Sequence, residues 1–193
     1  DVIINVHHFA DIIIDYLKVN DDFGMHIEIS REEILLDTGG GLKKAGWFFE
    51  GDAEPFLLHN VDVLSTINFR AMLRFHNERQ ALATVAVQDR PTSRYLIFDE
   101  QLQLCGRRLV REQKTDLVRS SEHPRELAFA GIHIVSPRLL PMLTERGAFS
   151  IIDSYLRIAR DGERILGFRA DSYDWRDVGT PEKVAQATAH FQP

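Results

Sequence analysis

Two aspartates are the residues of this sequence whose type and position best fit chemistry. Asp62 ends the apolar run Phe56–Asp62, and Asp177 follows an aromatic residue in the segment WRDVGTPEKV at Trp175–Val184. Carboxylates at the ends of two separate strands are suitable ligands for Mg²⁺ or Mn²⁺ rather than for zinc. Each aspartate alone is equally typical of a turn closed by a side-chain hydrogen bond. Together they favour one divalent-ion site.

A glycine-rich segment lies between the first strands, in the sequence LDTGGGLKKA at Leu36–Ala45. The pattern predicts a turn that leads into a helix, with Thr38 as the N-cap. Because Gly39 and Gly40 lack side chains, a base or a phosphate can lie against their backbone N–H groups. The alternative is that the glycines only permit a positive φ before the helix.

Four further residues are candidates for the same site. Asn60 and His59 lie beside Asp62 and shape its surroundings, although His59 equally fits a buried hydrogen-bonding role. Gly131 interrupts the strong strand LAFAGIHIV, and a glycine at such a position marks the close approach of another backbone or of a ligand. Arg94 opens a strand, where it either reaches a phosphate or belongs to the surface.

The composition indicates a globular domain rather than a nucleic-acid-binding or membrane protein. The chain has 193 residues, 44% of them hydrophobic, and a net charge of −6, which argues against a nucleic-acid backbone as the main partner. No run approaches the ~20 apolar residues of a membrane span. The single Cys105 cannot form an internal disulfide, which favours the cytoplasm.

Hydrophobic periodicity predicts strands that alternate with helices along residues 1–193, which we expect to form a single domain. Right-handed crossovers should then give a mostly parallel α/β sheet. Consecutive strands between Ala81 and Cys105 predict an antiparallel part, so that the sheet is mixed. The polar, aperiodic segment Arg107–Pro124 is predicted to be a mobile loop or an excursion of the chain. The expected strands are Val2–Val6, Met25–Ile29, Phe56–His59, Ala81–Val87, Tyr95–Phe98, Leu102–Cys105, Leu127–Val135 and Arg164–Phe168, and the expected helices are Phe9–Val19, Asn68–His76, Ile151–Ala159 and Thr180–His190.

The motifs, in their order along the chain, resemble those of sugar-1-phosphate nucleotidyltransferases. The similarity is greatest to the branch with mannose-1-phosphate guanylyltransferases and N-acetylmuramate-1-phosphate uridylyltransferases. It extends over nearly the whole chain, through the segments INVHHFAD, PFLLHNVD, FAGIHIVSPRLL and WRDVGTPEKV. The resemblance implies a Rossmann-like nucleotidyltransferase fold, with a mixed, mostly parallel sheet and helices on both faces.

The resemblance also implies roles for individual residues. Family members read the nucleotide base with the loop that matches Leu36–Gly41, which contains Thr38, Gly39 and Gly40. They hold Mg²⁺ with the aspartates that match Asp62 and Asp177, and they present to the sugar a backbone glycine that matches Gly131. The implied reaction transfers a nucleoside monophosphate from a nucleoside triphosphate to a sugar 1-phosphate and releases pyrophosphate.

The sequence departs from the family pattern at its beginning. The chain opens directly with the apolar strand Val2–Val6, which matches the second strand of the family, so a first strand-helix unit and its Gly-x-Gly-x-Arg phosphate loop are missing. We expect these residues alone to be inactive, poorly soluble, or paired with a second copy through the exposed edge. The alternative function is a non-catalytic module of the same fold that binds a nucleotide sugar or serves in assembly.

Overall fold

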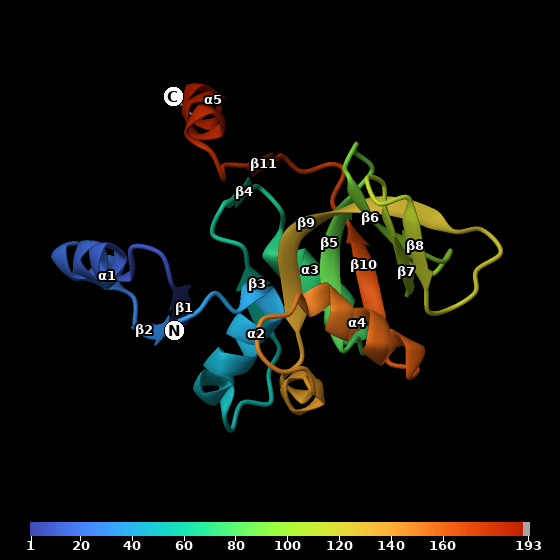
Figure 1. The fold of residues 1–193 in the computed structure, drawn as a ribbon, viewed down its shortest axis with the longest axis horizontal. Helices are drawn as coiled ribbons and strands as arrows, with labels where there is room; N and C mark the ends of the chain where they lie inside the picture. Colours follow the sequence, from blue (N-terminus) through green and yellow to red (C-terminus); the bar gives the residue numbers. More distant parts are fainter. Residues whose placement is uncertain (191–193) are drawn as a thin grey trace. The chain divides into compact units, whose positions relative to one another are not determined.

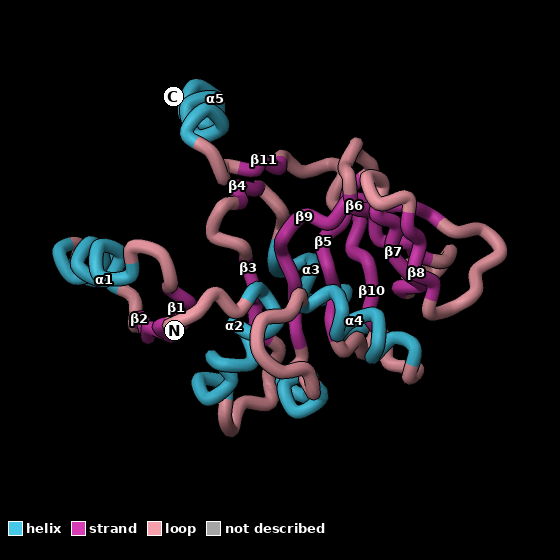
Figure 2. The backbone as a smooth tube through the Cα atoms, in the orientation of Figure 1, coloured by secondary structure: helices cyan, strands magenta, loops and turns pink. Residues whose placement is uncertain are grey.

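The computed structural model describes residues 1–190 and divides the chain into two compact units. The first unit combines Asp1–Ala53 with Leu140–Tyr155, and the second combines Glu54–Leu139 with Leu156–Pro193. Figure 1 shows the course of the chain, and Figure 2 shows its helices and strands by colour. In the described residues, no helix is both long enough and apolar enough to cross a membrane.

The first unit is built around a small parallel sheet. Strand β1 (Val2–Val6) pairs with β2 (Ile27–Arg31), and helix α1 (Ala10–Val19) connects them, as the change of period in the sequence predicts. The chain then forms helix α2 (Asp37–Lys44). The other short elements of this unit are the 3-10 helices η1 (Asp21–Gly24) and η2 (Ala45–Phe49).

The second unit contains a seven-stranded mixed sheet. Its order is β10-β5-β9-β6-β7-β8, and β3 also pairs with β9. Helix α3 (Phe69–Glu78) turns Met72 and His76 into the core, and its N-cap Asn68 accepts a hydrogen bond from the backbone of Ala71. The strands are β3 (Phe56–His59), β5 (Ala83–Gln88), β6 (Arg94–Phe98), β7 (Leu104–Leu109), β8 (Lys114–Leu117), β9 (Arg125–Val135) and β10 (Ile165–Arg169).

The mixed character of the sheet is confirmed, and antiparallel pairing contributes more of it than the sequence indicates. Strand β10 runs parallel to β5, whereas the other pairs of this sheet are antiparallel. The physical reason is β9, which runs antiparallel to each of its neighbours β3, β5 and β6. The remaining helices are α4 (Ile151–Arg160), the 3-10 helix η3 (Pro137–Met142) and α5 (Pro181–His190).

The prediction of a mobile loop over Arg107–Pro124 is wrong for its first part. Strands β7 and β8 form an antiparallel hairpin there, with Gly106 paired to Leu117. Its polar side chains pair with one another: Arg107 Nε donates to Asp116 Oδ2 at 3.0 Å, and Lys114 Nζ lies 3.1 Å from Asp116 Oδ1. Charged residues opposite one another stabilise a solvent-facing hairpin without producing an apolar alternation.

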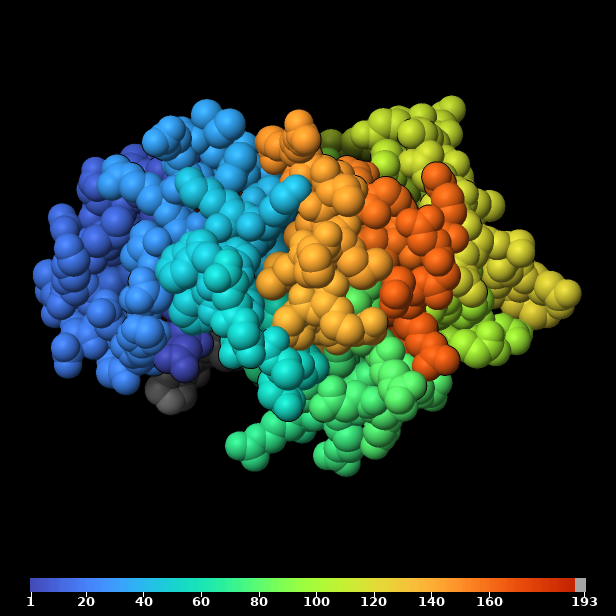
Figure 3. All heavy atoms as spheres, turned by 90° about the horizontal axis from the view of Figure 1, so that it is seen from below, coloured from blue at the N-terminus to red at the C-terminus, as the bar shows by residue number. Residues whose placement is uncertain are grey.

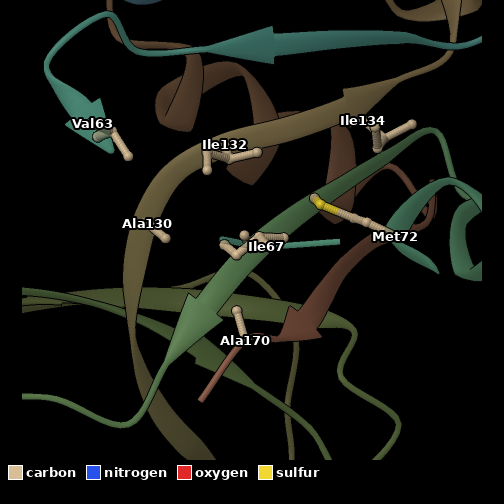
Figure 4. Packing of buried hydrophobic residues seen from close by; sticks show 8 residues of the cluster. Val63, Ile67, Met72, Ala130, Ile132, Ile134 and Ala170 are labelled. Carbon is tan, nitrogen blue, oxygen red and sulfur yellow. The ribbon is translucent and has the colours of Figure 1, made fainter. Parts of the chain in front are cut away.

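A hydrophobic cluster fixes the segments that surround the two candidate aspartates. Figure 4 shows Val63 and Ile67 packed with side chains from β9 and with Met72 of α3. Tyr173 and Trp175, which lie just before and on the strand that carries Asp177, pack against the same cluster. Burial of this apolar surface holds two segments that are more than a hundred residues apart in sequence.

Candidate functional site

Asp62 and Asp177 meet on a two-stranded ribbon that is separate from the main sheet. Strand β4 (Val63–Ser65) pairs with β11 (Trp175–Asp177) in antiparallel register, so that Asp177 is opposite Val63. The backbone N–H of Val178 donates to Asp62 O at 2.8 Å and extends the pairing to Asp62 itself. The expectation that each aspartate ends a strand is therefore corrected for Asp62, which precedes β4, whereas Asp177 ends β11.

The two carboxylates converge on Gly179. A Cβ atom at this glycine would lie 3.1 Å from Asp62 Oδ2 and 3.2 Å from Asp177 Oδ1. Oxygen atoms of both aspartates thus border the same point of the backbone. Glycine leaves that point free of side-chain atoms, and Asp62 is exposed to solvent.

Asp177 is held in its ionised form by two donors. The backbone N–H of Gly179 donates to Oδ1 at 2.8 Å, and Lys183 Nζ donates to Oδ2 at 2.7 Å. The hydrogen bond from Lys183, followed by that from Gly179, lowers the pKa of the Asp177 carboxyl below its ordinary value of 3.8. Lys183 lies in the first turn of α5, directly after the Gly-Thr-Pro segment.

The residues of the ribbon fit a magnesium ion better than a metal enclosed by the protein. Among residues 1–190, no group of three or more His, Cys, Asp or Glu side chains is placed to hold a metal ion. Mg²⁺ is commonly bound by one or two carboxylates, with water and substrate phosphates as the other ligands. The converging oxygens of Asp62 and Asp177 match that donor set. Asp177 is 40% exposed at its side chain, which leaves room for such ligands.

A bulge in β9 presents three successive carbonyl groups to the surroundings of the ribbon. Three residues of β5, from Val85 to Val87, face five residues of β9, from His133 to Phe129. The chain is bent at this place, as Figure 4 shows around Ala130 and Ile132.

Each of the three carbonyls accepts a hydrogen bond from a different segment. Phe129 O accepts from Arg90 Nη2 at 2.8 Å, and Ala130 O accepts from Trp175 Nε1 at 2.7 Å. Gly131 O accepts from the backbone N–H of Asn60 at 2.9 Å. The bulge therefore ties the loop before β4, the strand β11 and the loop after β5 to one short stretch of β9.

The structure gives Gly131 a conformational role within the protein. Its φ of 75° lies in the left-handed region, and a Cβ atom would come within 3.1 Å of Asn60 Nδ2 and Val63 Cγ2. The glycine thus permits the close approach of the Asn60–Val63 loop. This is one of the two explanations that its place in a strand suggests. The sugar contact that the family resemblance implies for Gly131 stays a prediction.

Arg90 and Lys183 are charged neighbours of Asp177 to which the sequence analysis gave no role. Arg90 follows the carboxyl end of β5. Because α/β sheets bind ligands at the carboxyl ends of their strands, this position could have indicated a role for Arg90 from the sequence. Its guanidinium lies 3.7 Å from the centroid of the Trp175 ring. No pattern in the sequence connects Arg90 with the indole, because their contact depends on the β9 bulge.

In the first unit, the prediction of a glycine turn capped by Thr38 is wrong. The glycines lie inside α2, which begins at Asp37, and Leu36 occupies the N-cap position without a side-chain hydrogen bond. The Thr38 hydroxyl instead accepts from the backbone N–H of Ile151, the first residue of α4, at 3.1 Å. Thr38 therefore serves the start of a different helix.

The backbone of the glycines is already occupied by protein atoms. Gly39 N and Gly40 N both donate to Phe149 O, at 2.9 and 3.3 Å, and Phe149 N donates to Leu36 O at 3.0 Å. A Cβ at Gly39 would overlap the Phe149 ring, and one at Gly40 would lie 2.6 Å from Gly147 O. Figure 3 shows this segment, in orange, against the blue and cyan residues of α2 and η2. Close packing accounts for these glycines, and a contact with a nucleotide base stays a prediction.

A buried network holds the start of α2 from its other side. Glu32 is 7% exposed, and its carboxylate accepts from Asn5 Nδ2 at 2.9 Å and from the backbone N–H of Leu36 at 3.0 Å. Asn5 Nδ2 also donates to Gly41 O at 3.0 Å. Neither residue belongs to a pattern that the sequence analysis recognised, and their pairing across β1 and β2 became visible only in the structure.

Two secondary candidates have ordinary structural surroundings. His59 Nδ1 lies 2.7 Å from Asn60 O and thus supports the loop before β4, in agreement with its hydrogen-bonding interpretation. Arg94 is exposed at the start of β6.

A comparison with protein families finds one model, described as nucleotidyl transferase, that matches residues 1–192. The mannose-1-phosphate guanyltransferase of Candida albicans is 26% identical over 198 residues, which cover 99% of this chain and 51% of that protein. A probable mannose-1-phosphate guanylyltransferase 2 of Oryza sativa subsp. japonica is 25% identical over 185 residues, with 94% of this chain and 49% of that protein covered. The chain spans about half the length of these curated relatives.

Solved structures share the fold at lower sequence identity. HddC from Yersinia pseudotuberculosis has a TM-score of 0.73 and 18% identity, and the match covers 98% of this chain and 78% of that one. A UDP-glucose pyrophosphorylase complexed with UDP-glucose has a TM-score of 0.71 and 16% identity, with 99% and 80% covered. These similarities confirm the nucleotidyltransferase fold that the motifs imply.

Proposed function

This chain belongs to the nucleotidyl transferase family, and we propose on that premise that the protein transfers a nucleoside monophosphate from a nucleoside triphosphate to a sugar 1-phosphate. An oxygen of the sugar phosphate attacks the α-phosphorus in line, a new P–O bond forms, and the bond to the β-phosphate breaks. Pyrophosphate leaves with that electron pair, and no covalent enzyme intermediate is needed.

The observation that supports this proposal most strongly is the convergence of Asp62 and Asp177 on Gly179. Two strands distant in sequence pair so that both carboxylates border one point. When bound there, Mg²⁺ would bring the phosphates of the two substrates together and neutralise charge that develops on them. The two aspartates would hold the ion, and the ribbon would fix their positions.

The glycine helix and the β9 bulge take the substrate-binding roles in this proposal. We assign the nucleotide to the region of Thr38, Gly39 and Gly40, supported by the family resemblance of that segment. We assign sugar binding to Gly131. We assign a contact with the nucleotide to Asn60, whose backbone N–H donates to the Gly131 carbonyl. A cytoplasmic location belongs to the same proposal, supported by the buried free thiol of Cys105.

Pyrophosphate release from the natural protein tests the proposal. GTP and mannose 1-phosphate form the first pair, because the names of the relatives give mannose 1-phosphate and a guanyl group, which GTP would supply. A panel of the other nucleoside triphosphates and sugar 1-phosphates follows. Release that depends on both substrates and on Mg²⁺ supports a transferase. Tight binding of a nucleotide sugar without turnover for any pair would instead support the non-catalytic module.

A further inference from the structure

Arg90 is a cationic side chain that two contacts fix beside the aspartate pair. It hydrogen-bonds to Phe129 O through Nη2 and stacks on the ring of Trp175 with its Cζ 3.7 Å from the centroid. Trp175 and Asp177 are two positions apart on β11, so their side chains project from the same face of that strand. The guanidinium thus lies on the face of the ribbon that carries Asp177.

The attachment leaves the guanidinium partly dehydrated and incompletely hydrogen-bonded. Its Nε atom is buried and has no hydrogen-bond partner within the described part of the chain, whereas the side chain as a whole is only half-buried. Burial lowers the pKa of Arg90 from its ordinary value, and the negative charge of Asp177 opposes that shift only in part. Partial dehydration of a cation with an unsatisfied donor costs free energy. The negative charge of a bound anion would offset part of that cost.

Asp177 does not serve as that anion by a direct bond. Its two carboxylate oxygens accept hydrogen bonds from Gly179 N and Lys183 Nζ. Arg90 is not one of the donors to these oxygens, and Asp177 acts on its guanidinium through charge. The cation therefore retains capacity for a further negative group beside the aspartate pair.

We propose that Arg90 binds the phosphate group of the sugar 1-phosphate and orients it for attack. A stacked, planar guanidinium is suited to the paired oxygens of a phosphate, and its fixed position reduces the entropy lost on binding. The assignment to the sugar phosphate rather than to the triphosphate rests on the proposed function. Arg90 bonds to Phe129 O, two residues from Gly131, which we assign to the sugar.

Steady-state kinetics of Arg90 variants in the natural protein test this proposal. Arg90→Gln removes the charge, and Arg90→Lys keeps the charge without the planar fork. We expect Arg90→Gln to raise KM for mannose 1-phosphate, or for the best substrate of the panel, about 10-fold or more. KM for the nucleoside triphosphate should stay within about twofold, and Arg90→Lys should give an intermediate value.

Arg79→Gln is the matched control. Arg79 also lies over an aromatic ring, at 5.4 Å from the Phe75 centroid, but it precedes β5 whereas Arg90 follows it. The two arginines are therefore near opposite ends of one strand. Arg79→Gln should leave both KM values unchanged. Equal KM values for mannose 1-phosphate in the Arg90→Gln and Arg79→Gln proteins would overturn the proposal, as would parallel increases for both substrates.

Calorimetric titration with mannose 1-phosphate separates this inference from the proposed function. If the wild-type protein transfers no nucleotide but binds the sugar phosphate, and Arg90→Gln loses that binding, the transferase is refuted and the anion site stands. Absent binding in the wild type, or unchanged binding in Arg90→Gln, refutes the site. If Arg90→Gln does not fold, the titration of Arg90→Lys decides, because this variant keeps the charge without the planar fork. Weaker binding than in the wild type supports the site, and wild-type affinity refutes it.

Discussion

The glycine-rich helix of the first unit and the aspartate ribbon of the second both contain family motifs, but their polar groups are used differently. In α2, the N–H groups of Gly39 and Gly40 donate to Phe149 O, so the protein itself satisfies them. On the β4–β11 ribbon, carboxylate oxygens of Asp62 and Asp177 border an open point at Gly179. The carboxylate oxygens of the ribbon can therefore accept a ligand, whereas the N–H groups of the two glycines are used within the protein.

Glycines and converging carboxylates differ in how directly they indicate a ligand site. Glycine is required wherever two chain segments approach closely, whether the second segment belongs to the protein or to a ligand. A pair of converging carboxylates with exposure to solvent is costly to maintain by mutual repulsion and is stabilised by a cation. Chemistry is thus more directly indicated by Asp62 and Asp177 than by the glycines.

Loss of either ribbon carboxylate should have the largest effect. We expect Asp62→Asn and Asp177→Asn to reduce kcat of nucleotidyl transfer at least about 100-fold, because a charge-stabilising contribution of several kcal/mol disappears. Circular dichroism should show an unchanged fold, since both side chains are partly exposed. Asp174→Asn, on the exposed approach to β11, is the control and should keep its activity. Wild-type turnover in either ribbon variant would refute the catalytic assignment.

Substitution of a packed glycine should lower the stability of the fold. Gly39→Ala places a Cβ against the Phe149 ring and 2.9 Å from its carbonyl oxygen, so we expect a loss of about 1–3 kcal/mol in the free energy of unfolding. Gly46→Ala is the matched control, because no atom lies within 4 Å of its added Cβ. Urea denaturation measures both. Equal stability of the two variants would show that the glycines of α2 are not required for packing.

A smaller effect is expected at Gly131, where conformation and contact both contribute. Gly131→Ala should cost about 1–2 kcal/mol for the positive φ alone, with a further loss from the approach to Asn60 and Val63. Gly147 has a φ of 69° and no atom within 4 Å of an added Cβ, so Gly147→Ala reports the conformational cost by itself. Denaturation curves of the two variants should differ. Identical losses would contradict a role of Gly131 in the approach of the Asn60–Val63 loop.

The smallest effect concerns the pH dependence of Asp177. Lys183 lowers the pKa of this carboxyl, so the pair stabilises the fold above the ordinary value of 3.8 and loses that contribution as pH falls through the lowered value. In Lys183→Met, the pKa should rise toward 3.8. Carboxyl chemical shifts followed by NMR between pH 2 and about 6 measure it. An unchanged titration would show that the hydrogen bond from Lys183 is not formed in solution.

Much of the fold could be predicted from local pattern. The helix at Ala10–Val19 and the strand at Val2–Val6 follow from their apolar periods. The hairpin of β7 and β8 could not, because its Arg107–Asp116 pair replaces the apolar alternation by which strands are recognised. Helix α2 was also misjudged at its start, since contacts with the distant Phe149 decide where the helix begins.

The candidate site was predictable only in part for a similar reason. Asp62 and Asp177 each stand out as a carboxylate after an apolar run. The order of the motifs along the chain resembles that of the family, and the resemblance implies that the two residues share one metal site. Arg90, in contrast, is one of many arginines in loops, and its contact with Trp175 depends on the bulge that Gly131 permits in β9. Long-range contacts of this kind leave no spacing in the sequence.

Binding of Mn²⁺, followed by the decrease of the free-ion signal in electron paramagnetic resonance, tests most directly whether Asp62 and Asp177 form one divalent-ion site. We expect about one ion per chain in the wild type and in Asp174→Asn. Asp62→Asn and Asp177→Asn should each weaken binding about 10-fold or more, because either change removes a charged ligand. Wild-type affinity in either of these two variants would contradict a shared site.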